Sequence, residues 1–448
     1  MKAQSRRLAC PSVTNPLDTG DGFLARLVPT GATIGLEALG NLCAAAREYG
    51  NGIIEVTARG SIQVRGLKPD TIAAFAETVR ALHITADGVP ITVDPLAGLE
   101  TNGAIDAFAL SDALRRRLAR EQFTAQLGPK VSVLIDGGRA LHLDQLPADI
   151  RLRIETTAGG PSVSLALGGD AFGATPVGII PPSEATEITR RILEMIANRG
   201  REARARDLVR EGGFAALRFA ISPLLRHAGR TLRRPPSQPI GLHRLGGGRL
   251  ALGIGFAFGH TTAELLGELI DAAKASGAIG VRMAHRALLA ICVCDEAATQ
   301  LTAAAERLGL ITRANDPRRY IATCAGAPIC ASARIPSRAL APLVATAAAG
   351  LLDGSFVLHL SGCAKGCAHP TESALTLVGR RGRCDVVING TAGDSPVGSI
   401  TTQALQSRLA VLAEEIGQAR RHGERAIEIL ARFGAIRTAS TLTEVSHG

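Results

Sequence analysis

An internal repeat limits the fold of this chain more than any other feature. The segment from Leu36 to Leu67 aligns without gaps, at a constant offset of 227 residues, with the segment from Ala263 to Cys294. Leu39 falls on Leu266, Gly50 on Gly277 and Arg59 on Arg286. Self-similarity at a fixed offset indicates that one structural unit occurs twice. We therefore expect two halves related by duplication.

Each copy predicts the same order of elements. An amphipathic helix ends at the glycine, a pair of extended segments follows, and residues 69–84 and 295–311 predict a second helix. A longer region of strands and helices follows each copy. Its predicted strands are 129–138 and 162–169 in the first half and 356–360, 373–379 and 384–390 in the second, with helices at 183–200 and 337–352.

These patterns predict an α+β protein with pseudo-twofold symmetry. Each half would contain a small repeat and a larger αβ domain, and a ligand would bind between the halves, where domain interfaces form clefts. The stretch between the halves is rich in Pro, Gly and Arg, which is typical of a linker. The expected domains are 15–90, 91–227, a linker at 228–250, 251–315 and 316–436.

Charge and composition narrow the function. The formal net charge of +10 favours an anionic partner. Nucleic acid is disfavoured, because the chain has no Trp and two Tyr and so lacks stacking platforms for bases. The N-terminus has no apolar stretch typical of a secretory signal, and no segment predicts a membrane span. We expect a soluble, cytoplasmic protein with no membrane partner.

Four cysteines form two closely spaced pairs near the C-terminus. Cys324 and Cys330 lie in TCAGAPICAS, and Cys363 and Cys367 lie in SGCAKGCAHP. In a reducing compartment such thiols bind metal or stay free. The wider C-x₅-C spacing and the small neighbouring residues favour a 4Fe–4S cluster, while zinc and unrelated free thiols remain alternatives. The other cysteines are interpreted as structural: Cys10, Cys43, Cys292, Cys294 and Cys384.

The C-x₅-C and C-x₃-C pattern resembles the cluster signature of sulfite and nitrite reductases. That family is likewise an internal duplication, with ferredoxin-like half-domains, two larger αβ domains, and sirohaem held between the halves. EVTARGSIQVRGL resembles the strand whose arginine reaches the tetrapyrrole, and PKVSVLID resembles the active-site lysine strand. The resemblance thus implies tetrapyrrole contacts at Arg59 and Lys130, with Gln63 and Arg65 nearby; the repeat adds Arg286.

Two cations of the reductase pattern are missing here. Ser132 stands in place of the second lysine, and DPLAGLETN has no arginine. The chain is also similar to the precorrin-3B synthases, a branch of this superfamily in which the tetrapyrrole is the substrate. That resemblance implies a monooxygenase of aerobic cobalamin biosynthesis, which hydroxylates precorrin-3A with O₂ and closes a lactone.

The same resemblance implies the cofactors and partners. They are a 4Fe–4S cluster, a mononuclear non-haem iron and NADH as the ultimate source of electrons. No nucleotide-binding fingerprint occurs in a strand–helix context, so we expect a separate reductase or ferredoxin as donor. Lys365 and His369 are candidates to support the cluster or ligate iron. The alternatives are a sirohaem-dependent sulfite or nitrite reductase and a non-catalytic zinc- or cluster-stabilised binding protein.

Overall fold

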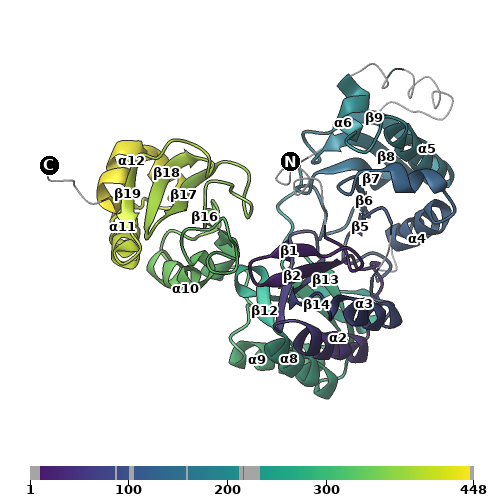
Figure 1. Cartoon of the computed structure of the whole chain (residues 1–448), viewed down its shortest axis with the longest axis horizontal. Coiled ribbons are helices and arrows are strands. Elements are labelled where there is room, and N and C mark those ends of the chain that lie inside the picture. Colours follow the sequence, from purple (N-terminus) through teal and green to yellow (C-terminus); the bar gives the residue numbers. More distant parts are fainter. Residues whose placement is uncertain are drawn as a thin grey trace. The chain divides into compact units, whose positions relative to one another are not determined.

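The computed structural model describes residues 11–85, 88–99, 105–157, 160–210, 215 and 233–443 (Figure 1). The chain divides into two compact units. The first consists of Met1–Leu17, Leu24–Ile254 and Thr261–Thr312, and the second of Asp18–Phe23, Gly255–His260 and Arg313–Gly448. The first unit contains both copies of the sequence repeat, and the second contains the paired cysteines.

The repeat predicted from the sequence is confirmed as a structural repeat. Both copies run helix, strand, strand, helix, and their first helices begin at the aligned positions Leu36 and Ala263. The apolar positions that aligned in sequence face inward, because Leu39, Leu42, Leu266 and Leu269 are all buried. The elements are α2 (Leu36–Tyr49), β3 (Ile53–Val56), β4 (Ile62–Leu67) and α3 (Ile72–Ala81), then α8 (Ala263–Ala275), β13 (Ala278–Ala284), β14 (Ala287–Cys292) and α9 (Asp295–Arg307).

Each repeat is completed by further strands. The first sheet has the order β1-β2-β4-β3-β12 and the second β10-β11-β14-β13. The additional strands are β1 (Leu17–Thr19), β2 (Gly22–Leu27), β10 (Gly241–Arg244), β11 (Leu250–Gly255) and β12 (His260–Thr262). Part of the expected linker is therefore a hairpin: β10 pairs antiparallel with β11. Gly247 and Gly248 form its turn with positive φ, which is why this strand region has a linker-like composition.

The two repeats meet at a pseudo-twofold contact inside the first unit. His285 Nδ1 lies 3.1 Å from the carbonyl oxygen of Ala58, and these residues are 227 positions apart, which is the repeat offset. Residues related by a twofold axis touch one another only close to that axis. The equivalent helices α2 and α8 also pack together (Figure 1). The symmetry inferred from the sequence is thus present in the packing.

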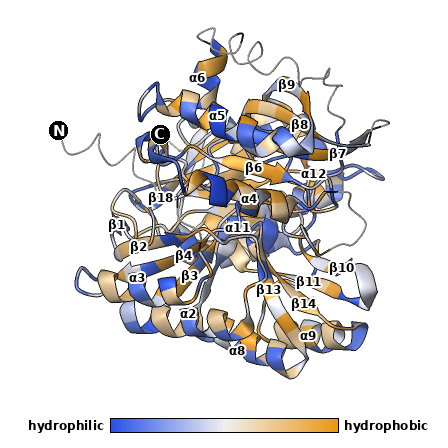
Figure 2. Cartoon of the chain, turned by 90° about the vertical axis from the view of Figure 1, so that its right-hand side faces the viewer, coloured by the Kyte–Doolittle hydropathy of each residue, from blue (hydrophilic) through white to orange (hydrophobic). Residues whose placement is uncertain are grey.

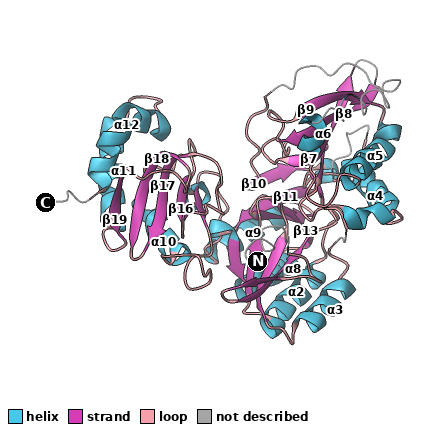
Figure 3. Cartoon of the chain, turned by 45° about the horizontal axis from the view of Figure 1, so that its top comes forward, coloured by secondary structure: helices cyan, strands magenta, loops and turns pink. Residues whose placement is uncertain are grey.

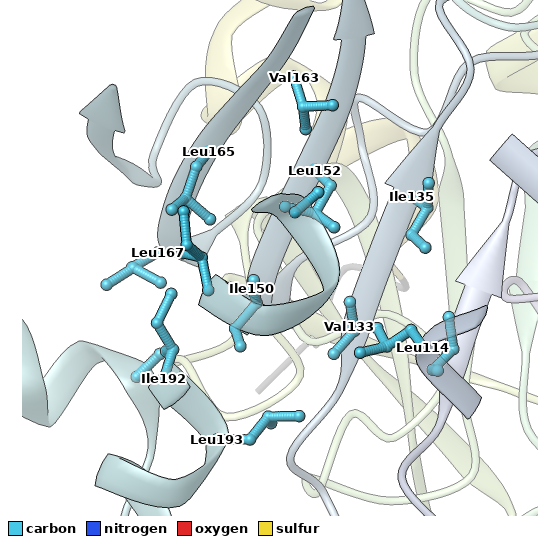
Figure 4. Close-up of a cluster of buried hydrophobic side chains, with 14 of the residues drawn as sticks. Leu114, Val133, Ile135, Ile150, Leu152, Val163, Leu165, Leu167, Ile192 and Leu193 are labelled. Carbon is cyan, nitrogen blue, oxygen red and sulfur yellow. The ribbon is translucent and has the colours of Figure 1, made fainter. Parts of the chain in front are cut away.

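The first αβ domain contains the sheet β5-β6-β7-β8-β9, in which β5, β6 and β7 are parallel and the rest antiparallel. Side chains of α5 and of the strands form its core, including Ile192, Leu193, Val133 and Leu152 (Figure 4). The elements are β5 (Ile91–Val93), α4 (Ala107–Leu118), β6 (Val133–Asp136), β7 (Ala148–Thr157), β8 (Gly160–Gly169), β9 (Thr175–Ile180), α5 (Ala185–Ala197) and α6 (Ala205–Arg210).

The second αβ domain repeats this topology. Its sheet β15-β16-β17-β18-β19 has the same directions, with three parallel strands followed by two antiparallel ones. Helix α12 packs against β18 and β19 (Figure 3). Helix α10 packs against β15 and β16. The elements are β15 (Ile321–Thr323), α10 (Ser337–Ala347), β16 (Leu358–Ser361), β17 (Ser373–Arg380), β18 (Arg383–Gly390), β19 (Gly398–Thr401), α11 (Leu405–Ala419) and α12 (Ala426–Leu442).

The predicted elements of the αβ domains are present, with some shorter than expected. The strand predicted at 129–138 is limited to Val133–Asp136, and the helix predicted at 337–352 ends at Ala347. Apolar residues concentrate on the strands, as β6 illustrates, whereas the helices carry both polar and apolar residues (Figure 2). Among the described helices, none combines the length and apolar character that crossing a bilayer requires.

Candidate functional site

The paired cysteines follow the ends of neighbouring parallel strands in the second unit. Cys324 comes directly after β15, and Cys363 comes two residues after β16. Because β15 and β16 are parallel, the loops at their carboxyl ends lie at the same edge of the sheet. Burial raises the pKa of Cys367, and the thiols of Cys363, Cys324 and Cys330 raise it further. The four predicted ligands are therefore brought together.

Small residues shape both cysteine loops. The backbone N–H of Cys330 donates to the carbonyl of Gly326, which has φ +73°, at 2.7 Å. The backbone N–H of Gly362 donates to Sγ of Cys324 at 3.2 Å. Such N–H donors stabilise a thiolate and tune the potential of a bound cluster. The glycines thus allow tight turns and direct backbone donors toward sulfur.

The spacing of the sulfurs distinguishes a zinc site from an iron–sulfur cluster. A tetrahedral zinc site with Zn–S bonds of 2.3 Å would place its sulfurs about 3.8 Å apart. Among the described residues, the one group of three or more ligand-type side chains with all ligand atoms within 4.8 Å is Asp136, His142 and Asp144. Among the cysteines that the structure describes, no three sulfurs lie within this distance of one another. The wider separation disfavours zinc and suits a four-iron cluster, whose irons occupy separate corners.

The loop surfaces also fit a cluster. A Cβ added at Gly362 would lie 3.1 Å from Sγ of Cys324 and 2.9 Å from Cβ of Ala333. One added at Gly20 would lie 2.3 Å from the carbonyl oxygen of Ile329. Larger residues would push the cysteine loops out of place. Mutual repulsion of four thiolates is relieved by a cation among them, so these residues suit a 4Fe–4S cluster.

Lys365 and His369 lie in the same loop region. Lys365 Nζ donates to Oγ of Ser332 at 2.7 Å and lowers the pKa of Cys367, although less than burial and the other thiols raise it. The His369 ring lies 5.6 Å from that of His359, and Oγ1 of Thr371 is 3.1 Å from its Nε2. His359 is fully buried on β16. Two imidazoles thus lie beside the cysteine loop.

The cysteines interpreted as structural differ in their surroundings. Cys43, Cys292 and Cys384 are buried, and burial raises the pKa of Cys43 and Cys384 to about 12. These three agree with the prediction of small apolar residues. Cys294 does not, because it is exposed at the N-cap of α9 rather than within the apolar strand. Cys10 lies outside the described residues.

Arg59 and Arg286 lie in the hairpin turns that meet at the pseudo-twofold contact. The guanidinium of Arg59 donates to the carbonyl of Pro147, and the backbone N–H of Arg286 donates to the carbonyl of Thr57 at 3.1 Å. Arg286 has φ +51°, and burial lowers its pKa. A small cleft of about 40 Å³ beside these turns is lined by residues that include Arg59, Ser61, Thr92 and Arg282. The repeat therefore brings arginines from both halves to one place.

Gln63 and Arg65 are held in a buried polar network on β4. Arg65 Nη1 lies 3.6 Å from Oε1 of Glu55. In the amide orientation that satisfies both ends, Gln63 donates to Glu55 at 2.9 Å and accepts from Arg26 at 2.8 Å. Both side chains are less than a tenth exposed. The positions equivalent to Gln63 and Arg65 in the second repeat are Ala290 and Cys292, so this buried polar network occurs in one half alone.

Lys130 is exposed on the turn before β6 rather than on the strand itself. Ser132, which replaces a second lysine, is buried, and its backbone N–H donates to Oδ2 of Asp149 at 3.0 Å. Oδ2 of Asp149 also accepts from Nη2 of Arg204 at 2.8 Å. Ser132 therefore offers little to an anionic ligand, because it is buried and its backbone N–H already binds a carboxylate.

The sequence analysis did not single out His359 or the group of Asp136, His142 and Asp144. His359 carried one signal, a histidine within the apolar strand FVLHL. The group Asp136, His142 and Asp144 carried none, since isolated acidic and histidine residues are common in loops. These three side chains converge after β6, where Arg234 pairs with both carboxylates.

The chain is similar to proteins of known family along most of its length. Residues 15–82 match the family described as Nitrite/Sulfite reductase ferredoxin-like half domain. A solved structure, the Mycobacterium tuberculosis NirA protein, matches with a TM-score of 0.76 at 19% identity, covering 93% of this chain and 84% of that one. This likeness confirms the duplicated α+β fold predicted from the sequence.

Named relatives divide into two groups. "Sulfite reductase [ferredoxin] 2" of Mycolicibacterium paratuberculosis is 23% identical over 80% of this chain and 70% of its own. "Ferredoxin–nitrite reductase" of Synechococcus elongatus is 26% identical over 81% and 77%. "Precorrin-3B synthase" of Sinorhizobium sp. is 37% identical over 99% of this chain and 96% of its own. The chain therefore belongs to the precorrin-3B synthase family, within the nitrite and sulfite reductase superfamily.

Proposed function

We propose that this protein is an oxidoreductase that converts precorrin-3A to precorrin-3B. The reaction consumes O₂ and electrons, places a hydroxyl on the macrocycle and closes a lactone with a ring acetate, in aerobic cobalamin biosynthesis. The observation that carries the proposal is the convergence of Cys324, Cys330, Cys363 and Cys367 in a chain that matches a precorrin-3B synthase almost end to end.

The four cysteines would hold a 4Fe–4S cluster. When bound, such a cluster supplies electrons one at a time, which suits oxygen chemistry. The chain's own contribution is to fix the loops and to stabilise negative charge on sulfur. Gly362 does so through its backbone N–H, and Lys365 through its charge.

Arginines would bind the substrate. A tetrapyrrole with many carboxylates needs several cations, and a guanidinium grips a carboxylate with two parallel N–H donors. Arg59 lines the cleft beside the pseudo-twofold contact, and Arg286 lies at the same contact. Gln63 and Arg65, which are buried against Glu55, would position this surface rather than make first contact. Lys130, exposed before β6, is a further candidate for a carboxylate.

The finer cofactor assignments rest on the family resemblance. They are a mononuclear non-haem iron, NADH as the ultimate reductant, and a separate reductase or ferredoxin as donor. His369 is the candidate iron ligand, with His359 beside it. Asp136, His142 and Asp144 do not fit this iron, because Arg234 already pairs with both carboxylates. A reducing compartment such as the cytoplasm is supported by the eight described cysteines, which are all free thiols.

Spectroscopy on protein purified without oxygen tests the proposal. We expect a broad iron–sulfur absorption band and a cluster signal in electron spin resonance after reduction, with no sirohaem in an acid extract. Adding precorrin-3A, O₂ and a reducing system should then give precorrin-3B. Extraction of about one sirohaem per chain would instead establish a sulfite or nitrite reductase. A colourless zinc protein without turnover would support the non-catalytic alternative.

A further inference from the structure

The loop that carries Cys363 and Cys367 has a structural twin in the first half. This loop joins β16 to β17, and the twin joins β6 to β7. In both places the two strands are parallel neighbours, so the strand register shows which residues correspond. Ile135 pairs with Leu152 in the first half as Leu360 pairs with Leu377 in the second. Two residues earlier, Val133 pairs with Ile150, and the corresponding residues of the second half are Leu358 and Leu375. The strands end at Asp136 and Ser361 and resume at Ala148 and Ser373, so the two loops have the same length.

This register assigns a counterpart to each residue of the cysteine loop. His142 corresponds to Cys367, and Asp144 corresponds to His369. One strand away, Asp94 follows β5 as Cys324 follows β15. Even a hydrogen bond is repeated, since the N–H of Gly137 donates to Oδ2 of Asp94 at 2.8 Å where the N–H of Gly362 donates to Sγ of Cys324. An aspartate and a histidine thus stand where the second half has Cys324 and Cys367, whereas Gly138 occupies the position of Cys363.

The cation in this twin loop is the side chain of Arg234. Its Nη2 lies 2.5 Å from Oδ2 of Asp136 and also pairs with Oδ1 of Asp144, while its Nε donates to Oδ2 of Asp144 at 2.9 Å. Backbone N–H groups occupy further positions on Asp136: those of Gly138 at 2.8 Å and of Leu143 at 3.2 Å. The oxygens that a metal would need are therefore already used.

His142 adds a second tie to the same segment. Its Nε2 lies 2.7 Å from the carbonyl oxygen of Pro235, and its Nδ1 lies 3.3 Å from Oδ2 of Asp144. A carbonyl only accepts, so Nε2 must carry a proton. Burial lowers the pKa of Arg234, but the hydrogen bonds that it donates to Asp144 and Asp136 outweigh burial and raise that pKa above its usual value. The guanidinium accordingly remains charged.

We propose that the loop between β6 and β7 is a duplicated metal-binding loop in which Arg234 replaces the metal, so that the loop clasps the segment 233–240. This segment runs into β10, the edge strand of the second repeat's sheet. The clasp thus fastens the first αβ domain to the chain that leads into the second repeat. Metal chemistry is left to the second αβ domain. The proposal is independent of the substrate assigned above.

Two measurements on the purified holoprotein test the clasp. Arg234→Met removes the cation while keeping an apolar stem of similar length. Arg244→Ala is the matched control, because Arg244 lies on β10 in an exposed pair with Asp295. We expect proteinase K to cut between residues 233 and 240 at least tenfold faster in Arg234→Met than in wild type, with the site mapped by mass spectrometry and Arg244→Ala unchanged. Equal cutting rates in all three would overturn the clasp.

Manganese binding tests whether the arginine stands in for a metal. Loss of the free Mn²⁺ signal in electron spin resonance should show one more bound ion per chain in Arg234→Met than in wild type, and His142→Ala in that background should remove it. If wild type binds an ion, or carries iron beyond its cluster, that His142→Ala abolishes, the loop is a metal site and the proposal fails.

A third variant covers a folding failure. If Arg234→Met does not fold, Asp136→Asn and Asp144→Asn combined with Arg234→Met remove the uncompensated buried charges. That triple variant should fold and still be cut rapidly at 233–240. Cutting at the wild-type rate would overturn the proposal.

Discussion

The backbone N–H of Gly362 donates a hydrogen bond to Sγ of Cys324, 3.2 Å away. The donor is on the loop after β16 and the acceptor on the loop after β15, so one contact joins the two cysteine pairs. The close approach requires glycine, because a Cβ at position 362 would lie 3.1 Å from that sulfur.

Gly362→Ala should therefore impair the cluster without unfolding the protein. The added methyl also meets Cβ of Ala333 at 2.9 Å, so the loop must shift and the thiol moves with it. We expect iron and acid-labile sulfide per chain to fall by about half or more. Gly350→Ala is the control, since its Cβ would make ordinary contacts of 3.6 Å or more to Ala413. Wild-type iron content in Gly362→Ala would contradict this account.

Cys324→Ser should abolish the iron–sulfur band and turnover together, and the same holds for Cys330, Cys363 and Cys367. Hydroxyl oxygen is a poor substitute for thiolate sulfur as an iron ligand. Cys384→Ala, in the buried core of the same domain, should keep the band at a cost of about 1 kcal/mol in unfolding free energy. Optical spectra and iron analysis of both variants provide the comparison, and an intact band in a ligand variant would remove that residue from the site.

Stability should decline in alkaline solution because of buried thiols. Burial raises the pKa of Cys43 and Cys384 to about 12, whereas an unfolded thiol has its ordinary value near 9. Below pH 9 both states keep the proton and the stabilising contribution is complete. Between pH 9 and 12 only the unfolded state releases the thiol proton. Each buried thiol therefore lowers the unfolding free energy by up to about 1.4 kcal/mol per pH unit.

Cys384→Ala should accordingly flatten the pH dependence of the unfolding free energy in that range, as measured by urea titration. Cys294→Ala, which removes an exposed thiol, is the control variant. Identical slopes in wild type and Cys384→Ala would show that this thiol ionises in the folded state as readily as in the unfolded state.

Arg59→Lys should raise the KM for precorrin-3A by about tenfold or more and change kcat less. Lysine keeps the charge but loses the two-pronged donor geometry that grips a carboxylate. The guanidinium of Arg59 also donates to Pro147, so the melting temperature of the variant must be recorded alongside. Arg80→Lys, near the end of α3, is the control and should behave as wild type. An unchanged KM with a lowered melting temperature would make Arg59 purely structural.

The parts of the fold predicted from sequence are those that rest on spacing. The repeat was visible because buried leucines such as Leu39 and Leu266 must recur at the same helical positions. The cysteine pairs were visible because thiols are rare and metal binding limits their separation. Their convergence then follows from two parallel strands that end at one edge.

The features that were missed depend on contacts between distant segments. The strand β10 was hidden because Pro and Gly surround it, and its pairing with β11 is set by a glycine turn. The similarity of the β6–β7 loop to the cysteine loop was not visible in the sequence, because it lies in the strand register. Gly137 matches Gly362, but His142 occupies the position of Cys367. The burial of Gln63 and Arg65 depends on Glu55 and Arg26, which no linear pattern links.

The contact between Ala58 and His285 joins a residue to its own counterpart. Such a contact is what a pair of identical subunits would make across their shared axis. When the gene for such a subunit is duplicated and fused, the contact is kept but each copy can mutate independently. The two copies now differ in this way, since Gln63 and Arg65 form a buried polar network in one and Ala290 and Cys292 stand at the same positions in the other. A duplicated scaffold whose two copies differ in sequence can present different side chains to the two sides of an asymmetric ligand.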